Sequence, residues 1–345
     1  MENRITTRVN LEHYGFAGMD ASQLGAIKSA ADYYHIAITP TRIYGMTGLA
    51  FLHVLDERAI HPNAGPPIPD IYRLASNLGV HIEGIHAHAD GETFADLQAE
   101  AWNRARAAVD SGKPVFAKNI AQLDQTSVIT GYDETGYYID SWHTGYQHSE
   151  DVIPWNLLGL SRCPCVNCAL ERSQAEPSAA TGGVVSLHWA SPAAAEDELA
   201  AFEEALRFVL RLNTEAAYEE FGQTYYVGPR AYEEWIAAIE RDAVLKYDFA
   251  LVIEVVSEAR LHAKLFLEEM KDACSAEARQ AVDEAIQLYS EISMRVRRLK
   301  EQYPYEQPRE LFGRGDKEDL LASLREISVL EQRALGSLQQ IQLSL

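Results

Sequence analysis

The stretch Gln125-Thr-Ser-Val-Ile-Thr-Gly-Tyr-Asp-Glu-Thr-Gly-Tyr-Tyr-Ile-Asp140 holds two short runs of β-type residues on either side of a turn. Residues 127–130 and 137–140 are rich in β-branched and aromatic side chains, and the Asp-Glu-Thr-Gly between them has turn chemistry. Residues 114–118, a little upstream, have the same strand character. The pattern predicts three short strands of a sheet.

Two helices are expected before these strands. Small and apolar residues recur at helical spacing over residues 22–34, and Asp20 or Ser22 is available to cap the first turn. Residues 96–109 form a second such segment, which Ser-Gly-Lys-Pro at 111–114 would end. Helices followed by short strands predict an α+β domain.

The second half of the chain is helical in pattern. Apolar residues recur every three or four positions from Ala278 to Leu299, with charged residues on the other faces. The turn-rich residues 174–183 mark a junction, and 345 residues exceed the size at which one core usually keeps growing. We expect an α+β domain over residues 1–185 and an all-α helical bundle over residues 190–345. The further helical segments of this bundle are residues 196–212, 230–239, 244–270 and 317–341.

Charge and composition restrict the class of partner. The chain has 30 basic and 51 acidic residues, a formal net charge of -21, which opposes binding to nucleic-acid phosphates and anionic lipids. No window approaches the roughly 18 consecutive apolar residues of a membrane span, and the Met-Glu-Asn-Arg start lacks a signal-peptide core. Three of the four cysteines crowd into residues 163–168, unlike a secreted disulfide framework. We expect a cytoplasmic protein without nucleic-acid or membrane partners.

The helix and strands resemble those of papain-like cysteine peptidases. Ser22-Gln-Leu-Gly-Ala-Ile-Lys-Ser-Ala-Ala-Asp-Tyr-Tyr34 resembles the opening helix of bacteriocin-processing peptidases, in which a cysteine occupies the position of Ser22. The strand from Gln125 is similar to the one that carries the catalytic histidine, and Asp140 keeps the third member of the triad. Phe16 stands near the position of the oxyanion-hole glutamine. The resemblance implies a papain-like fold in which three of four catalytic positions have changed.

A more specific resemblance covers most of the chain. Tyr44-Gly-Met-Thr-Gly-Leu-Ala-Phe51, Asp110-Ser-Gly-Lys-Pro-Val115 and Gly228-Pro-Arg-Ala-Tyr-Glu-Glu-Trp-Ile236 are similar to segments of the butirosin-biosynthesis protein H family. Its amino-terminal domain belongs to the same peptidase-like superfamily, and a helical second half often follows. The resemblance implies acyl transfer from a carrier protein to an aminoglycoside amine, hence a link to secondary metabolism.

The substitutions favour binding over catalysis. Serine needs a base to become a nucleophile, and the Gln125 amide cannot accept a proton at neutral pH. We therefore expect a non-catalytic protein, without a cofactor, that binds a small molecule or peptide in the former active-site cleft. One alternative is an acyltransferase or amidohydrolase acting through Ser22, with His143 as a base oriented by Asp140. Another is a structural protein that self-associates as a homo-oligomer.

The spacing of three cysteines indicates a second candidate site, a metal site, which has weaker support than the peptidase-like site. Cys163, Cys165 and Cys168 offer three soft ligands, and His143 or His148 could complete a tetrahedral zinc site. The competing interpretation is a strand in which the cysteines are small buried hydrophobes.

A second histidine-rich run precedes the strands described above. His81, His86 and His88, with Asp90, have the alternation of the His-x-His pair in metallohydrolases. No barrel pattern follows them, so histidines at the end of a surface strand are the simpler interpretation.

Overall fold

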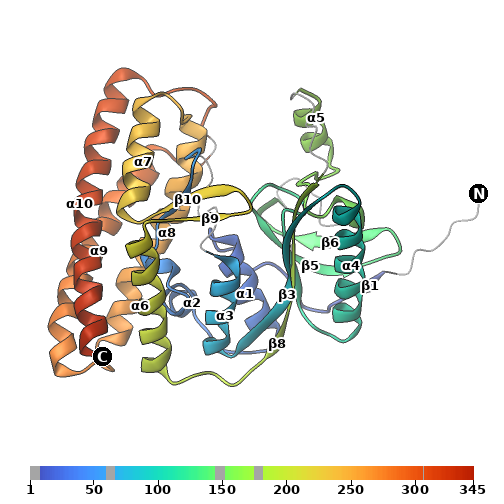
Figure 1. Cartoon of the computed structure of the whole chain (residues 1–345), viewed down its shortest axis with the longest axis horizontal. Helices are drawn as coiled ribbons and strands as arrows, with labels where there is room; N and C mark the ends of the chain where they lie inside the picture. The colour runs from blue at the N-terminus through green and yellow to red at the C-terminus, as the bar shows by residue number, and fades with distance from the viewer. Residues whose placement is uncertain (1–7, 60–66, 144–151, 175–181, 306) are drawn as a thin grey trace, which may run out of the picture. The chain divides into compact units, whose positions relative to one another are not determined.

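The computed structural model describes residues 8–59, 67–143, 152–174, 182–305 and 307–345 (Figure 1). Contacts divide the chain into two compact units, each assembled from two segments. Unit 1 comprises residues 1–38 and 79–195, and unit 2 comprises residues 39–78 and 196–345. The division therefore differs from the continuous domains 1–185 and 190–345 expected from the sequence. Residues 39–78 belong with the helical part of the chain.

Unit 1 is built on an antiparallel sheet with the strand order β3-β8-β4-β5-β6-β7, and β1 pairs with β5. The strands predicted at residues 114–118, 127–130 and 137–140 are confirmed as β4, β5 and β6. The longest pair joins β3 and β8 over eleven residues each. In the segment expected to be a junction, residues 175–181 lie outside the described residues, and β8 begins at Gly182. The strands are β1 (Val9–Asn10), β3 (Val80–Asp90), β4 (Val115–Lys118), β5 (Thr126–Tyr132), β6 (Gly136–Asp140), β7 (Ile153–Pro154) and β8 (Gly182–Pro192).

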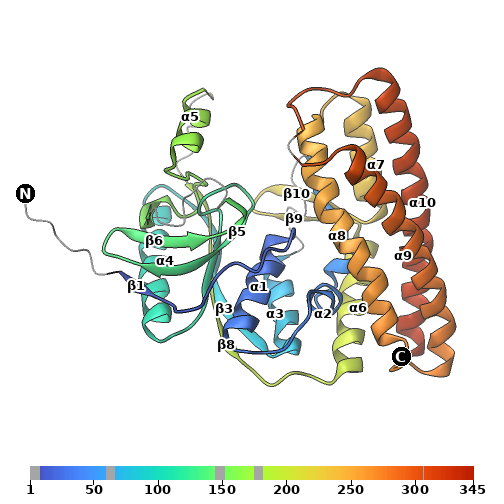
Figure 2. The ribbon, with the colours of Figure 1, turned by 180° about the vertical axis from the view of Figure 1, so that it is seen from behind.

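Two long helices cover the sheet of unit 1. Figures 1 and 2 show α1 (Ser22–Tyr33) and α4 (Gly91–Asp110) on opposite faces of it. The apolar positions of α1, such as Leu24 and Ile27, are fully buried. Trp102 of α4 meets the ring of Tyr137 edge to face, at 5.0 Å between centroids. The short elements η4 (Trp155–Leu157) and α5 (Val166–Gln174) follow the sheet's β7 strand. These elements confirm the α+β class of the first domain.

Unit 2 is mainly helical, and the five helices expected from periodicity are confirmed as α6 to α10. The helix pairs α8–α9 and α9–α10 pack along their lengths. Its helices are α2 (Pro40–Met46), α3 (Ile68–Ala75), α6 (Glu198–Glu215), α7 (Pro229–Glu240), α8 (Lys246–Met270), α9 (Ala276–Gln302) and α10 (Arg314–Ser344), with the short turns η1 (Leu49–Phe51) and η2 (Ser76–Leu78).

A small sheet corrects the expectation that this region is all helical. Strands β2 (Val54–Asp56), β10 (Gln223–Val227) and β9 (Ala217–Glu220) form a three-stranded antiparallel sheet in unit 2. The β9–β10 turn uses Phe221 and Gly222, with φ of 50° and 77°. Two residues with positive φ match the twist of a tight hairpin. The hairpin thus interrupts the helical run between α6 and α7.

A buried ion pair and surface ion pairs tie the helices of unit 2 together. Arg260 of α8 and Glu331 of α10 lie 2.5 Å apart inside the unit, with 1% and 6% of their side chains exposed. The Arg260 guanidinium also donates to the backbone oxygens of Ala50 and Leu52, at 2.9 Å each. These bonds hold the η1 segment against α8, which explains why the 39–78 region belongs to unit 2.

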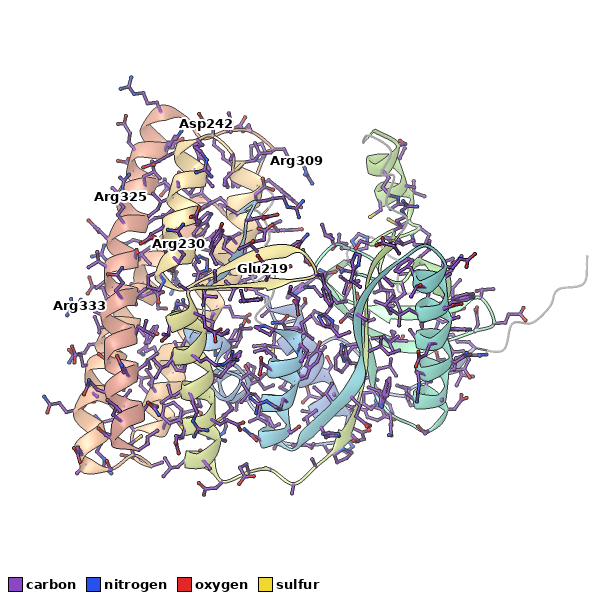
Figure 3. The ribbon with its side chains drawn as sticks, viewed as in Figure 1. Glu219, Arg230, Asp242, Arg309, Arg325 and Arg333 are labelled. Carbon is purple, nitrogen blue, oxygen red and sulfur yellow. The ribbon has the colours of Figure 1, made fainter. Side chains whose placement is uncertain are left out.

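The surface pairs sit where α10 meets the end of α7. The charged groups of Lys317 and Asp242 are 2.7 Å apart, and those of Arg325 and Glu240 are 2.5 Å apart. Asp242 and Arg325 are labelled in Figure 3. Exposed pairs of this kind contribute about 0–1 kcal/mol each. Among the described residues, none of the helices combines the length and apolar character needed to cross a membrane.

Candidate functional site

The structure joins Ser22 to Thr126, the residue that follows Gln125, by one hydrogen bond. Ser22 is the first residue of α1, and its hydroxyl oxygen accepts the backbone N–H of Thr126, the first residue of β5, at 3.0 Å. Gln125 directly precedes Thr126 in the chain. The start of the helix is therefore fastened to the start of the strand at the two positions that correspond to the nucleophile and the base in the peptidase resemblance.

Asp140 and Phe16 form the neighbouring contact. A carboxylate oxygen of Asp140 accepts the backbone N–H of Phe16 at 2.9 Å. Asp140, at the end of β6, is the register partner of Val128 on β5, and the Phe16 ring packs over Gly25 of α1. The four positions singled out in the sequence, Phe16, Ser22, Gln125 and Asp140, thus all lie in α1, β5 and β6 of unit 1 or shortly before α1 or β5.

Ser22 does not cap its helix. The residue at the N-cap position of α1 is Ala21, and the helix start has no side-chain cap hydrogen bond. The prediction of a Ser22 cap was wrong because the hydroxyl has a tertiary partner instead, the amide of Thr126. In this arrangement Ser22 connects two elements of secondary structure.

Two buried side-chain atoms beside this network have no hydrogen-bond partner. They are Nε2 of Gln23, which follows Ser22, and Oε1 of Gln125, which precedes Thr126. Gln23 is 6% exposed. Gln23 was not singled out from the sequence, although a polar residue on the buried face of a helix is a usable signal. The residues next to Ser22 and Thr126 in the chain thus hold one unpaired donor and one unpaired acceptor.

A second constellation is the Cys-His cluster, which consists of His143, Cys163, Cys165 and Cys168. One ligand atom from each residue lies within 4.8 Å of all the others. His143 follows β6, while the cysteines precede or begin α5. The structure thus brings the three predicted cysteines together with one of the two predicted histidines. His148 lies outside the described residues.

The geometry of the Cys-His cluster corrects two interpretations. Cys168 lies in helix α5 and Cys165 directly precedes it, so the alternative of a strand was wrong. Nε2 of His143 is 3.2 Å from the Cys168 sulfur and 3.9 Å from that of Cys165, while Nδ1 is 2.9 Å from the side-chain amide of Gln122. Both ring nitrogens are engaged, which disfavours His143 as a base for Ser22.

Burial shapes the chemistry of these thiols. It raises the pKa of Cys163. Burial, and then the neighbouring Cys165, raise the pKa of Cys168 to about 12. Without a cation the two groups therefore stay protonated at neutral pH.

The histidine run lies on β3 and faces other partners. Nδ1 of His86 is 3.0 Å from the hydroxyl of Ser186 on β8, and Nδ1 of His88 is 4.0 Å from a carboxylate oxygen of Asp90. Within the described residues, ligand atoms cluster for a metal at His143 and the cysteines and not along this run. A metallohydrolase-like pair is therefore not favoured.

Unit 2 has a polar groove along α9. Its volume is about 490 Å³, and its lining includes three carboxylates of α9 and Arg333 of α10, which is labelled in Figure 3. One of these carboxylates, Asp283, is paired with Lys271 at 2.6 Å. The groove is lined by Gln280, Asp283, Glu284, Gln287, Leu288, Glu291 and Arg333.

Comparison with known proteins adds no relatives: no protein-family model matches the chain, and no curated protein matches it in sequence. The structure therefore defines the class only broadly, as an antiparallel α+β unit combined with a mainly helical unit.

Proposed function

We propose that unit 1 is a non-catalytic binding module that holds a neutral, amide-containing small molecule or peptide in a site derived from a peptidase cleft. The observation that supports it is the pair of unpaired buried atoms, Gln23 Nε2 and Gln125 Oε1, in the residues that follow Ser22 and precede Thr126 in the chain. The sequence resemblance to papain-like peptidases, in which the positions of Ser22 and Gln125 are catalytic, also supports a binding site here.

The energetics favour a ligand with both donor and acceptor groups. A buried polar atom without a partner costs about 1–3 kcal/mol, so native proteins seldom leave one unsatisfied. A carboxamide or peptide group can accept from Gln23 and donate to Gln125. This match also holds if either glutamine amide is turned by a half rotation, because an amide ligand offers both kinds of group.

The four former catalytic positions support binding without covalent chemistry. Ser22 and Asp140 each accept a backbone N–H group, so both have a structural role. Gln125 carries no basic group, and a serine hydroxyl without a base is a weak nucleophile. The net charge of -21 further favours a neutral or cationic ligand. The butirosin-type resemblance suggests an amine- or amide-bearing compound of secondary metabolism.

Calorimetric titration of the full chain with neutral dipeptide amides and with the matching free acids tests the proposal. We expect the amides to bind and the acids to bind more weakly. Gln23→Leu and Gln125→Leu should each lower affinity about tenfold, equivalent to 1.4 kcal/mol. Gln280→Leu, at an exposed position of α9, is the matched control and should bind as the wild type does.

Two outcomes contradict the proposal. Equal affinity of the Gln125→Leu variant and the wild type would remove its structural basis. A covalent adduct on Ser22 after incubation with an activated ester, detected by intact mass, would favour the acyltransferase or amidohydrolase alternative. Light scattering on the same samples tests the alternative of a self-associating protein.

A further inference from the structure

We propose that His143, Cys163, Cys165 and Cys168 bind one zinc ion as a closed, structural site in unit 1. The proposal does not depend on the ligand-binding function, because it concerns the Cys-His cluster alone. It rests on the spacing of the four ligand atoms, on the groups that orient them and on their burial.

The spacing is close to that of a tetrahedron around zinc. Zn–S bonds of about 2.3 Å and Zn–N bonds of about 2.0–2.1 Å place neighbouring ligand atoms about 3.5–3.8 Å apart. The two measured separations from His143 Nε2 are 3.2 Å to Cys168 Sγ and 3.9 Å to Cys165 Sγ. All four ligand atoms lie within 4.8 Å of one another. Small side-chain adjustments are enough to complete the coordination.

Backbone groups hold the cysteines in this arrangement. The N–H of Cys163 donates to the carbonyl oxygen of Ala121 at 3.1 Å, which anchors the first ligand to the β4–β5 connection. The N–H of Cys168 donates to the sulfur of Cys165 at 3.2 Å. A hydrogen bond to the charged form of a thiol stabilises the thiolate. Cys165 also directly precedes α5, and the start of a helix favours negative charge.

Gln122 orients the histidine. Its side-chain amide lies 2.9 Å from Nδ1 of His143, which directs Nε2 towards the sulfurs. In the structure it is the Gln122 nitrogen Nε2 that faces Nδ1. When zinc takes the lone pair of Nε2 of His143, the ring proton is on Nδ1, and a half rotation of the amide, whose oxygen and nitrogen have nearly the same shape, presents its oxygen to that proton. Partners of this kind fix the tautomer of metal-bound histidines.

Charge and burial favour a divalent cation. His143, Cys163 and Cys165 are buried, and Cys168 is partly buried. Burial makes it unfavourable for a thiol to lose its proton. A bound cation offsets this cost, because its positive charge stabilises the thiolate that coordinates it. Four protein ligands leave no open coordination position, which distinguishes a structural zinc from a catalytic one. A mixed set of three thiolates and one imidazole suits zinc better than the four thiolates typical of iron–sulfur clusters.

The ion would connect three parts of unit 1. His143 follows β6, Cys163 is bonded to the β4–β5 connection, and Cys168 lies in α5. Helix α5 makes few other contacts with the sheet, and its Val166 and Leu170 side chains are exposed. Zinc therefore supplies the attachment that apolar burial does not provide for this segment.

Elemental analysis of the full chain, purified with reduced thiols and excess zinc and then desalted, tests the site. We expect about one zinc per chain. Titration of the metal-free wild type with cobalt should give thiolate-to-metal charge-transfer absorption and the visible bands of a tetrahedral site. This second measurement needs no variant and so does not depend on the folding of one.

Variants then assign the ligands. Cys163→Ser and Cys168→Ser should lower zinc content to a small fraction of the wild-type value. Cys274→Ser, which alters a buried cysteine in unit 2, is the matched control and should keep the full content. Zinc well below one per wild-type chain, iron–sulfur absorption, a Cys165–Cys168 disulfide in the reduced preparation, or full zinc retention by Cys168→Ser would each overturn the proposal.

Discussion

The side-chain amide of Gln122 lies 2.9 Å from Nδ1 of His143, and Nε2 of the same ring lies 3.2 Å from the sulfur of Cys168. The imidazole is therefore held between a polar partner and a thiol. Because groups that orient a metal ligand typically change metal affinity 10–100-fold when they are removed, we expect Gln122→Leu to weaken zinc binding by about that factor. Competition with a chromophoric chelator measures the change.

Gln122→Glu is the informative companion variant. Its carboxylate can accept the Nδ1 proton without the half rotation that the amide needs, so we expect zinc affinity at or above that of the wild type. Gln280→Leu, remote from the Cys-His cluster, controls for the loss of a glutamine. Equal affinities of Gln122→Leu and the wild type would show that Gln122 does not orient His143.

Removal of zinc should loosen one part of unit 1 and leave unit 2 unchanged. A structural zinc ion contributes directly to the folding free energy of the segments that it joins. We expect a chelator to increase amide hydrogen exchange in residues 119–125 and 163–168, and we expect α8 to α10 to keep their protection. Exchange measured by mass spectrometry reports both units in one experiment. Uniform loss of protection across the chain would instead indicate a general effect of the chelator.

The Ser22–Thr126 hydrogen bond should contribute to stability independently of any ligand. Thr126 is 1% exposed, so removing its acceptor leaves a buried backbone N–H unsatisfied. We expect Ser22→Ala to lower the free energy of unfolding by about 1–3 kcal/mol, measured by urea denaturation. Ser323→Ala is the control, since that hydroxyl donates to the carbonyl oxygen of Asp319 in the same helix and its loss should matter by less than about 0.5 kcal/mol. A similar small effect for Ser22→Ala would contradict the tertiary role.

The buried ion pair of unit 2, between Arg260 and Glu331, should contribute to the stability of that unit. Glu331→Leu leaves the Arg260 guanidinium buried without its counter-charge, and breaking such a pair typically costs about 3–5 kcal/mol. The double variant Arg260→Met/Glu331→Leu should recover a large part of this loss, because both charges are then absent. Urea denaturation followed by far-ultraviolet circular dichroism, to which the helices of unit 2 contribute most of the signal, measures both effects. If the double variant were as unstable as Glu331→Leu, the hydrogen bonds from Arg260 to η1 would be the dominant contribution.

Local sequence patterns predicted the elements better than their grouping. Helices α8, α9 and α10 were predicted because 25 or more residues of apolar periodicity outweigh local exceptions. The assignment of residues 39–78 to unit 2 depends on contacts such as Arg260 to the Ala50 carbonyl, 210 residues away in the chain. Periodicity carries no information about such pairs. The β9–β10 hairpin was missed because Ala217–Glu220 carries two glutamates, which are uncommon in strands, and the Phe-Gly turn lacks the Asn-Gly or Asp-Gly signal of a tight hairpin.

For the candidate sites as well, the sequence predicted residues that are close in the chain better than it predicted their tertiary partners. Spacing alone identified Cys163, Cys165 and Cys168 as a set of soft ligands, because they are close in sequence. It could not decide between His143 as a general base and His143 as a ligand, since that depends on which groups face its two ring nitrogens. Gln23 and Gln122 were missed because their importance arises from burial and from a tertiary partner respectively.

Acid should destabilise unit 2 through His53. This side chain is 1% exposed, and burial, followed by the nearby Arg260 guanidinium, lowers the pKa of His53 to about 3. It packs against the rings of Tyr232 and Trp235, at 4.5 Å and 5.4 Å between centroids. The unfolded chain takes up a proton at this residue near pH 6.5, while the folded chain does not until about pH 3. The free energy of unfolding therefore falls as the pH decreases through this window.

Urea denaturation at two pH values measures this effect. From the linkage relation we expect His53 to account for a loss of about 1 kcal/mol between pH 7 and pH 5.5. His53→Phe keeps an aromatic ring among Tyr232 and Trp235 and removes the titrating group, so the variant should lose less stability than the wild type over the same interval. His35→Asn is the exposed control, chosen because Asn tolerates the positive φ of 57° at that position. An equal loss in His53→Phe and the wild type would mean that His53 is already protonated, and paired, in the folded protein.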